Sequence, residues 1–379
     1  MRKVIWKQTM KKDNYTSAPD FLLMGAVGLI IVFGLFALAS ASSVYSLNKF
    51  GTPYYTILHQ MYTGIIPGFL AFYFFLNLDY RKLGKFTYLY YGITLALLLL
   101  VFIPGLAAGY GKTRSWINVF GFSFQPAEAA KLTFLLFLGS WIQKKGFSEI
   151  ISFTYGFIPF IFYLGIISYL ILEQPDLGTL IILVFMSLSV YFIAGAKLKH
   201  FLFFCALGIA GFTVKVFTTD YLMERVKVFL HPQSDIVNVG YQVYQSLIAI
   251  GSGGIFGRGF GKSQQKFLYL PEVSSDSIFP IIAEEMGFFI SSALIILFLF
   301  LMYRGIKIAM AAQDPLGRFL AIGIVVWITC QAFLNIAVMV GLAPVTGIPF
   351  PLVSAGGTAM VANLCALGIL INISKHRMA

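Results

Sequence analysis

The stretch "YLPEVSSDSIFPIIAEEMGFF", residues 269–289, passes from polar into apolar sequence with one aspartate, Asp276, at the join. A carboxylate at this place can cap the helix that the apolar residues predict. It can also act as a functional carboxylate in a polar cavity. Ser274 and Ser275 offer equivalent capping oxygens, so a cap does not require the aspartate. Asp276 is therefore a candidate catalytic residue, with the helix cap as the alternative.

Two further acidic residues, Glu284 and Glu285, follow in the same stretch. They lie about 12 Å deeper along the predicted helix, at 1.5 Å of rise per residue. We therefore expect that this side of the helix does not face lipid.

A second candidate pair, Glu128 and Lys131, occurs in "FQPAEAAKL". Their spacing places both on one face of a helix, where they can pair. The pair is either a salt bridge that ties helices together or part of a site facing a polar cavity, since ions within a membrane mark functional sites by default. In "EQPDLG", Glu173 and Asp176 flank Pro175 and allow the same two interpretations. There we favour the structural one, with Asp176 as the cap of the helix that follows.

Composition determines what surrounds these residues. The chain has 379 residues, of which 59% are hydrophobic and 11% charged, with a mean hydropathy of +0.84. Soluble domains carry about 25% charged residues, so this is an integral membrane protein. Apolar runs near the roughly 20 residues that cross a bilayer predict an all-α polytopic protein with ten transmembrane helices. The runs are 21–41, 57–76, 86–103, 127–142, 153–172, 177–193, 201–217, 278–302, 319–340 and 358–373. No small-residue cleavage site follows the first run, which we interpret as a retained span.

Basic residues orient the predicted bundle, because short cytoplasmic loops collect Lys and Arg. Of 27 such residues, 17 lie in the two tails and in alternate loops, which places both termini in the cytoplasm. The predicted organisation is a tail (1–20), a ten-helix domain (21–373) with an extracytoplasmic loop (218–277), and a second tail (374–379). The net charge of +12 follows mostly from this topology, so nucleic acid is not an expected partner. The three cysteines show neither a zinc spacing nor a disulfide framework.

The long loop is rich in aromatic residues and is expected to form short helices at the membrane surface. Its glycine-rich part, "GSGGIFGRGFGKS", misses the Walker pattern because Phe256 stands where that pattern needs glycine. We expect the glycines to permit tight turns and close packing instead. Arg258, Lys262 and Lys266 can attract an anionic headgroup there.

Taken together, several motifs resemble the SEDS family of bacterial cell-wall proteins, which includes FtsW, RodA and SpoVE. They are "RSWI", "FQPAEAAKL", "QPDLGT", "IFGRGFGKSQQKFLYLPEVSSDSIFPIIAEEMGF" and "GLAPVTGIPFPLVSAGGTAMVANLCALGILINIS", in family order over residues 20–374. The resemblance, nearest to the FtsW branch, implies a ten-helix peptidoglycan glycosyltransferase of the bacterial cytoplasmic (inner) membrane. Such a protein polymerises lipid II during cell division, beside a class B penicillin-binding protein and other divisome proteins.

The resemblance also implies roles for residues. Asp276 would be the general base that deprotonates the C4 hydroxyl of the acceptor N-acetylglucosamine, which attacks C1 of the donor with loss of undecaprenyl diphosphate. Lys131, then Arg114, then Arg258 would stabilise the diphosphate, and Glu128 would orient Lys131. A divalent cation, Mg²⁺ or Mn²⁺, is an alternative stabiliser. The implied substrate-binding residues are Arg114, Trp116, Gln125, Arg258, Lys262, Glu272 and Ser354.

The chain departs from the family pattern around these residues. The family's usual His-Thr-Asp is Ser274-Ser275-Asp276, and its Pro-Ser-Glu is Pro126-Ala127-Glu128. Its Ser-Tyr-Gly-Gly is Ser354-Ala355-Gly356-Gly357, and its paired arginine before Trp116 is reduced to Arg114 alone. These changes spare the carboxylates and the lysine but alter the surroundings of the acceptor.

Two other classes of function remain open. A lipid II flippase or transporter would share the polar residues, and the glycines and prolines of "GLAPVTGIPFP" are typical of the broken helices in transporters. However, no inverted repeat is visible, and the polar residues gather toward one face. A division scaffold would not need buried charge.

Overall fold

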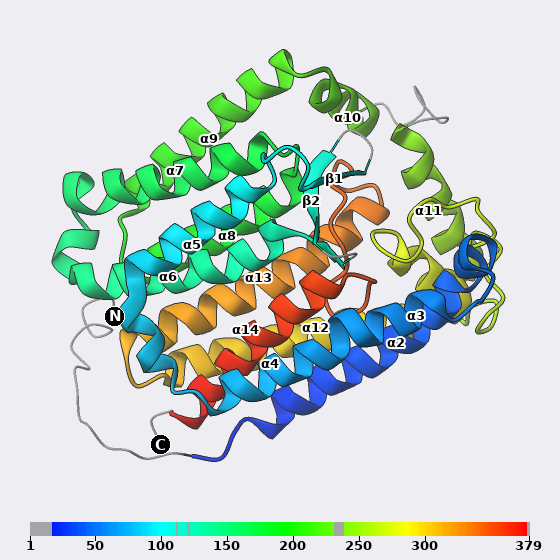
Figure 1. Ribbon diagram of the computed structural model, residues 1–379, viewed down its shortest axis with the longest axis horizontal. Coiled ribbons are helices and arrows are strands. Elements are labelled where there is room, and N and C mark those ends of the chain that lie inside the picture. Colours follow the sequence, from blue (N-terminus) through cyan, green and yellow to red (C-terminus); the bar gives the residue numbers. More distant parts are fainter. Residues whose placement is uncertain (1–16, 111–112, 120–121, 231–238, 377–379) are drawn as a thin grey trace.

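The computed structural model describes residues 17–110, 113–119, 122–230 and 239–376, and they form a bundle of long, mostly apolar helices (Figure 1). The helices are α2 (Phe21–Phe50), α3 (Tyr55–Gln60), α4 (Ile66–Asn77), α5 (Thr87–Leu100), α6 (Pro126–Ile150), α7 (Ile158–Leu172), α8 (Leu177–Ile193), α9 (Leu198–Thr218), α10 (Asp220–Leu230), α11 (Val239–Gly253), α12 (Ile278–Ala311), α13 (Pro315–Met339) and α14 (Gly357–Lys375). Short π- or 3-10-helical turns lead into three of them: η1 (Met61–Ile65), η2 (Tyr80–Phe86) and η3 (Phe153–Phe157).

Seven of the helical segments in the described part of the chain are long and apolar enough to cross a membrane. They include α2, α9, α12, α13 and α14, and α8 is a shorter apolar helix. The protein is therefore a multi-pass membrane protein.

The expectation of an all-α fold is wrong in one place. A three-stranded antiparallel sheet, ordered β1-β2-β3, lies between α5 and α6. Its strands are β1 (Ala107–Tyr110), β2 (Thr113–Val119) and β3 (Phe122–Phe124). Such a sheet satisfies its backbone between its own strands, and apolar runs of membrane-spanning length carry no signal for strands this short.

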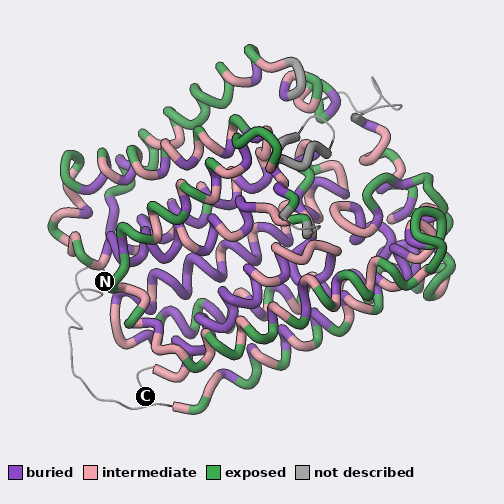
Figure 2. Tube along the Cα trace, viewed as in Figure 1, coloured by how far each residue is buried: buried purple, intermediate pink, exposed green. Residues whose placement is uncertain are grey.

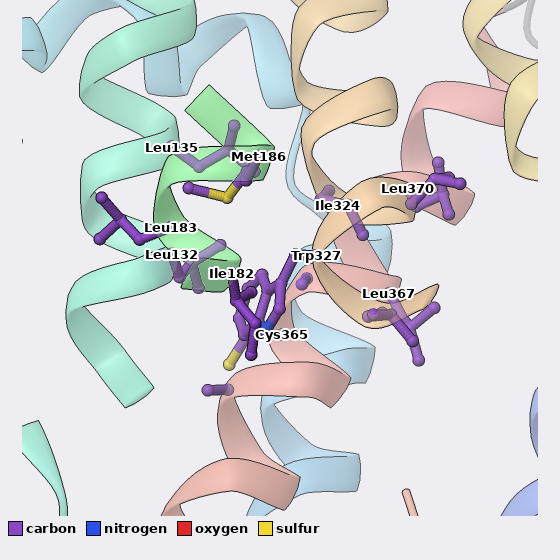
Figure 3. Packing of buried hydrophobic residues seen from close by; sticks show 14 of the residues in the cluster. Leu132, Leu135, Ile182, Leu183, Met186, Ile324, Trp327, Cys365, Leu367 and Leu370 are labelled. Carbon is purple, nitrogen blue, oxygen red and sulfur yellow. The ribbon is translucent and has the colours of Figure 1, made fainter. Parts of the chain in front are cut away.

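Burial is graded across the bundle, as Figure 2 shows. Most residues of α13 and α14 are buried, whereas α9 is exposed along most of its length. The core between α6, α8, α13 and α14 is apolar and includes Leu135, Met186, Trp327 and Leu367 (Figure 3). This core packs beside the N-terminal part of α6 and the C-terminal part of α13, on which candidate site residues lie.

Helix α12 is broken at Gly287, whose φ of 73° is left-handed. The turn after α11 packs against the break: Arg258 N donates to the Glu284 carbonyl (3.0 Å) and Phe288 N to the Gly254 carbonyl (3.0 Å). A Cβ on Gly257 would lie 2.3 Å from the Glu285 carbonyl oxygen. The glycine-rich motif therefore serves close backbone packing, which confirms that prediction.

A non-helical segment, residues 344–356, joins α13 to α14 and is largely buried. It passes close to α2, where a Cβ on Gly34 would lie 2.8 Å from the Val353 Cα atom. We call residues 344–356 the connecting segment.

Candidate active site

Asp276 lies in the turn just before α12 and is half-buried. The N-cap of α12 is Ser277, and no side chain there makes a capping hydrogen bond. Asp276 therefore does not cap the helix in this structure. Its carboxylate instead faces the connecting segment, where a Cβ on Gly347 would lie 3.5 Å from Asp276 Oδ2. Glycine at 347 leaves this side of the carboxylate open.

The electrostatic surroundings of Asp276 favour its protonated form. Burial raises the pKa of Asp276 to about 7, and the nearby negative charges of Glu272 and Asp176 add to the rise. Arg225 on α10 opposes it. Among the described residues, none donates a hydrogen bond to the carboxylate oxygens. A carboxyl group that titrates near neutral pH is suited to general base catalysis.

The turn that carries Asp276 is held through its backbone. Asn335 Nδ2 on α13 donates to the Asp276 carbonyl oxygen (2.8 Å). Ser354 Oγ donates to the Ser275 carbonyl, and Ala355 N donates to the Ser274 carbonyl (2.8 Å). Ser354 thus positions this turn, and its contact with substrate stays a prediction.

Glu272 begins the same turn in a left-handed conformation, with φ of 51°. Its carbonyl oxygen accepts hydrogen bonds from the backbone N–H groups of Ser275 and Ser277 (3.1 Å each). Its exposed carboxylate accepts from Ser275 Oγ (2.8 Å). A non-glycine residue in this region carries backbone strain, which is commonly found at functional sites.

Glu128 and Lys131 form the predicted ion pair on α6, with 2.7 Å between Nζ and Oε1. The side chains are only 1% and 0% exposed. Lys131 Nζ also donates to Gln331 Oε1 on α13 (2.9 Å) and lies 4.9 Å from the centre of the Trp327 ring. The pair therefore joins α6 to α13 inside the bundle. It contacts neither the Asp276 carboxylate nor solvent, so the two halves of the predicted site do not meet directly.

The N-cap of α6 is a second predicted residue, Gln125. Gln125 Nε2 donates to Asp176 Oδ2 (3.2 Å). Asp176 also accepts from Thr179 N (3.0 Å), which confirms it as the cap of α8. Because Asp176 adds to the pKa rise of Asp276, Gln125 belongs to the same polar region.

The sheet brings further predicted residues toward the start of α8. Ser115 Oγ in β2 donates to the Gln174 carbonyl just before α8 (2.9 Å), and Trp116 beside it is half-buried. The side chain of Arg114 lies outside the described residues.

Arg258 and Lys262 lie on the glycine-rich loop. Arg258 is paired with Glu284 (3.6 Å), and Lys262 is exposed. Neither makes a hydrogen bond or ion pair with Asp276. The expectation that Lys266 is available to a headgroup is wrong: it is buried and bonded to Glu285 (3.0 Å). Glu285 is 19 residues away in sequence, so the sequence pattern gave no sign of this pair.

Three residues at the site escaped the sequence analysis: Gln331, Asn335 and Arg225. The first two are polar residues four apart in "TCQAFLNIAV", so helical spacing within an apolar run was a usable signal. Arg225 Nη1 donates to the Val345 carbonyl (2.5 Å). It lies 51 residues before Asp276, and only the fold brings the two charges together.

A protein-only metal site does not fit this arrangement. Within the described ranges, no three His, Cys, Asp or Glu side chains gather in a way that could hold a metal ion. Magnesium ions are commonly held by one or two carboxylates together with substrate phosphates. The expected Mg²⁺ or Mn²⁺ stays a prediction.

Comparisons with known sequences agree with the motif order. Residues 20–379 match the family described as cell cycle protein, FtsW/RodA/SpoVE. Stage V sporulation protein E of Bacillus subtilis (strain 168) is 39% identical over 95% of this chain and 98% of its own length. A probable peptidoglycan glycosyltransferase FtsW of Geobacter sp. (strain M18) is 35% identical over 94% and 97%.

Solved structures share the architecture. A chain of a peptidoglycan synthase complex, described as coordinating polymerization and crosslinking, superposes with a TM-score of 0.76 and 25% identity, over 94% of this chain and 98% of its own. The rod shape determining protein RodA of Thermus thermophilus gives 0.69 and 26%, over 96% and 98%. Because the match extends over nearly the whole chain, the expected family is confirmed: the protein belongs to the FtsW/RodA/SpoVE family.

Proposed function

We propose that this protein is a peptidoglycan glycosyltransferase that joins lipid II units into glycan strands at the outer face of the bacterial cytoplasmic membrane during cell division. The observation that carries the proposal is Asp276, a half-buried carboxyl group with a pKa of about 7 in the turn before α12, facing the connecting segment. The names of the relatives and the solved synthase complex support the same chemistry.

Asp276 acts as the general base. It takes the proton of the acceptor C4 hydroxyl while that oxygen forms a bond to C1 of the donor sugar. The bond from C1 to undecaprenyl diphosphate breaks on the opposite face, so the configuration at C1 inverts. One base, a stabiliser for the departing diphosphate and alignment of the two sugars suffice for such a displacement. A pKa near working pH serves this role because a large share of the base is ionised while it is still basic enough to take the proton.

The cation that stabilises the departing diphosphate must be able to reach it. Lys131 is enclosed by Glu128, Gln331 and Trp327, so it would reach the diphosphate only after a rearrangement of this cluster. Arg225 lies within electrostatic reach of Asp276 and joins Arg114 and Arg258 as a candidate. Gln125, Trp116, Lys262 and Glu272 remain the proposed substrate contacts.

The proposed topology has ten spans with both termini in the cytoplasm. Helical segments overlap all ten apolar runs, and the basic loops alternate with the polar side that carries Asp276. In a variant lacking the three native cysteines, a cysteine placed at Gln264 is expected to react with an impermeant reagent added outside the cell. One placed at Lys145 is expected to be protected, and the reverse pattern would separate the site from its substrate.

The proposed partner is a class B penicillin-binding protein, alongside other divisome proteins. The likeness to a chain of a synthase complex in which polymerization and crosslinking are coordinated supports this partner. A lipid II flippase remains the alternative. The relatives are named as glycosyltransferases, which does not favour it.

Purified protein reconstituted with lipid II, with and without the partner, tests the proposal. Asn caps helices about as well as Asp but cannot accept the substrate proton. Asp276→Asn should therefore lower polymer formation about 100- to 10,000-fold while the protein stays folded. Asp79→Asn is the matched control, because Asp79 only caps η2 through Arg81 N (2.9 Å). Headgroup translocation without polymer by the wild-type protein would identify a flippase instead.

A further inference from the structure

The connecting segment, residues 344–356, is buried backbone that lies outside any helix. It runs through the bundle as non-helical backbone apart from one turn closed by Ser354 N on the Phe350 carbonyl (3.0 Å). Ile348, Phe350 and Leu352 in it are at most 3% exposed. Non-helical backbone at this depth is tolerated only where protein groups satisfy its carbonyl and N–H groups. The residues that satisfy it therefore determine its position.

Two amide side chains on one face of α13 supply these bonds. Gln331 Nε2 donates to the Pro349 carbonyl (3.0 Å), and Asn335 Nδ2, one helical turn later, donates to the Ile348 carbonyl (2.8 Å). On the opposite side, Gln60 Oε1 on α3 accepts from Gly356 N (2.9 Å). The segment is thus fixed at its middle and near its end.

The orientation of the Gln331 amide is itself fixed. Its Oε1 accepts hydrogen bonds from Lys131 Nζ (2.9 Å) and Trp327 Nε1 (3.0 Å), and both partners are donors. With two donors on one side, the NH₂ group must face the other side, where the Pro349 carbonyl lies. Lys131 in turn is held by Glu128 (2.7 Å). The buried ion pair therefore sets which end of Gln331 meets the connecting segment.

Close to α14, residues 354 and 355 of the connecting segment hold the turn that carries Asp276. Ser354 Oγ and Ala355 N donate to the carbonyls of Ser275 and Ser274, while Asn335 Nδ2 is shared between the Ile348 and Asp276 carbonyls. A displacement of residues 348–349 would therefore shift the backbone turn that carries Asp276.

We propose that Gln331 is a positioning residue for Asp276, acting through the connecting segment, with the Glu128–Lys131 pair fixing its amide. This inference rests on the proposed function and deepens it. It assigns the ion pair a task that a fully buried Lys131 can perform without touching substrate. Loss of this alignment lowers the rate of the chemical step because the reacting atoms no longer meet in the productive geometry.

Gln331→Met tests the proposal, because methionine keeps a similar volume and removes both amide contacts. The matched control is Asn372→Leu. Asn372 is also buried and also bonds to backbone, through Tyr80 N (3.1 Å) and the Leu76 carbonyl (2.8 Å), but these contacts lie near the end of α14, away from the Asp276 turn. Both variants should show lowered thermal stability, so stability alone does not distinguish them.

Two readouts do distinguish them. In reconstituted polymerisation, Gln331→Met should lower kcat between about tenfold and a hundredfold with a smaller change in KM, and it should shift the acid limb of the pH profile. In hydrogen–deuterium exchange, peptides covering 270–280 and 345–356 should exchange faster. Asn372→Leu should change neither kcat, the pH profile nor exchange in these peptides.

The exchange measurement needs no activity, so it separates failure of this proposal from failure of the proposed function. If the wild-type protein makes no polymer, exchange alone still decides whether Gln331 holds the Asp276 turn. Should Gln331→Met not fold, Gln331→Glu keeps an oxygen for Lys131 and Trp327, removes the donor to the Pro349 carbonyl and is read in the same way. Unchanged exchange in both peptides, or a kcat and pH profile like those of Asn372→Leu, would overturn the proposal.

Discussion

Asp276 and the pair Glu284–Glu285 come from one stretch of sequence, yet their carboxylates differ in how many hydrogen bonds they accept. Glu284 accepts hydrogen bonds from Ser263 Oγ (2.5 Å), Gln264 N (3.0 Å) and Gln265 N (3.3 Å). Glu285 accepts from Ser40 Oγ (2.7 Å) and Ser263 N (3.2 Å) and pairs with Lys266 (3.0 Å). The Asp276 carboxylate receives no such bond from any described residue.

The difference shows that donors, not residue type, decide what a carboxylate in this protein does. A buried carboxylate that accepts several hydrogen bonds has its polar atoms satisfied and becomes part of the structure. Glu284 and Glu285 thus fasten the glycine-rich loop to α12 and α2. A half-buried charge with few donors is costly to ionise, so it exchanges protons readily near neutral pH. Asp276 has the second environment.

The largest effect on stability should come from breaking the Glu285 side of this comparison. Glu285→Ala leaves Lys266 buried without its counter-ion, which should cost about 3 kcal/mol or more in the free energy of unfolding. Adding Lys266→Ala should recover part of the loss. Thermal unfolding of the two single variants and the double variant measures this coupling. Strictly additive losses would mean that the two charges do not interact.

The pH dependence of polymerisation should report Asp276. The base must be ionised, so kcat/KM should fall about tenfold per pH unit below its pKa of about 7 and level off above it. A pH series with lipid II at low concentration measures this profile. An acid limb centred near pH 4 would place Asp276 in a well-solvated or donor-rich site and would contradict the prediction.

Stability should depend on pH in the direction set by the raised pKa of Asp276. Because folding raises this pKa from an unfolded value near 3.8 to about 7, the folded state is penalised as the group ionises. The wild-type protein should therefore lose stability relative to Asp276→Asn as pH rises from about 4 to 7, with a constant difference above that. Melting temperatures of both proteins across this range test the sign. A melting temperature of the wild-type protein that rises relative to that of Asp276→Asn with increasing pH would contradict the prediction.

The smallest effect is expected for an exposed ion pair. Lys145 and Glu149 are 2.7 Å apart on α6, but their side chains are 30% and 46% exposed. Glu149→Ala should change the free energy of unfolding by about 0.5 kcal/mol or less, because water and salt screen such pairs. Denaturation experiments on Glu149→Ala and Glu285→Ala under the same conditions compare the two losses in the free energy of unfolding. Equal losses would remove burial as the reason for the difference.

Some of the candidate site was predictable from sequence because its signals are local. The pairing of Glu128 with Lys131 and the cap at Asp176 depend on residues three apart, a spacing that any helix converts into contact. The glycines of 251–263 were predictable as packing residues because a glycine-rich run is visible in the local sequence. The membrane environment followed from composition alone, because apolar runs of this length have no other stable solvent.

The remainder depended on contacts between distant segments. Sequence periodicity gave no sign of the strands at 107–124, of the burial of Lys266 against Glu285, or of Arg225 near Asp276. Each results from the way separate helices and loops meet, and no local pattern encodes it.

By itself, the sequence determined that this is a membrane protein, that Asp276 stands where chemistry is possible, and that Glu128 and Lys131 can pair. Only the tertiary structure decided that Asp276 receives no hydrogen bond at its carboxylate from the described residues and does not cap α12, and that Lys131 reaches Gln331 rather than open solvent. The physical reason is that spacing fixes which neighbours share a helix face, whereas the pKa and the accessibility of a charge depend on every group packed around it.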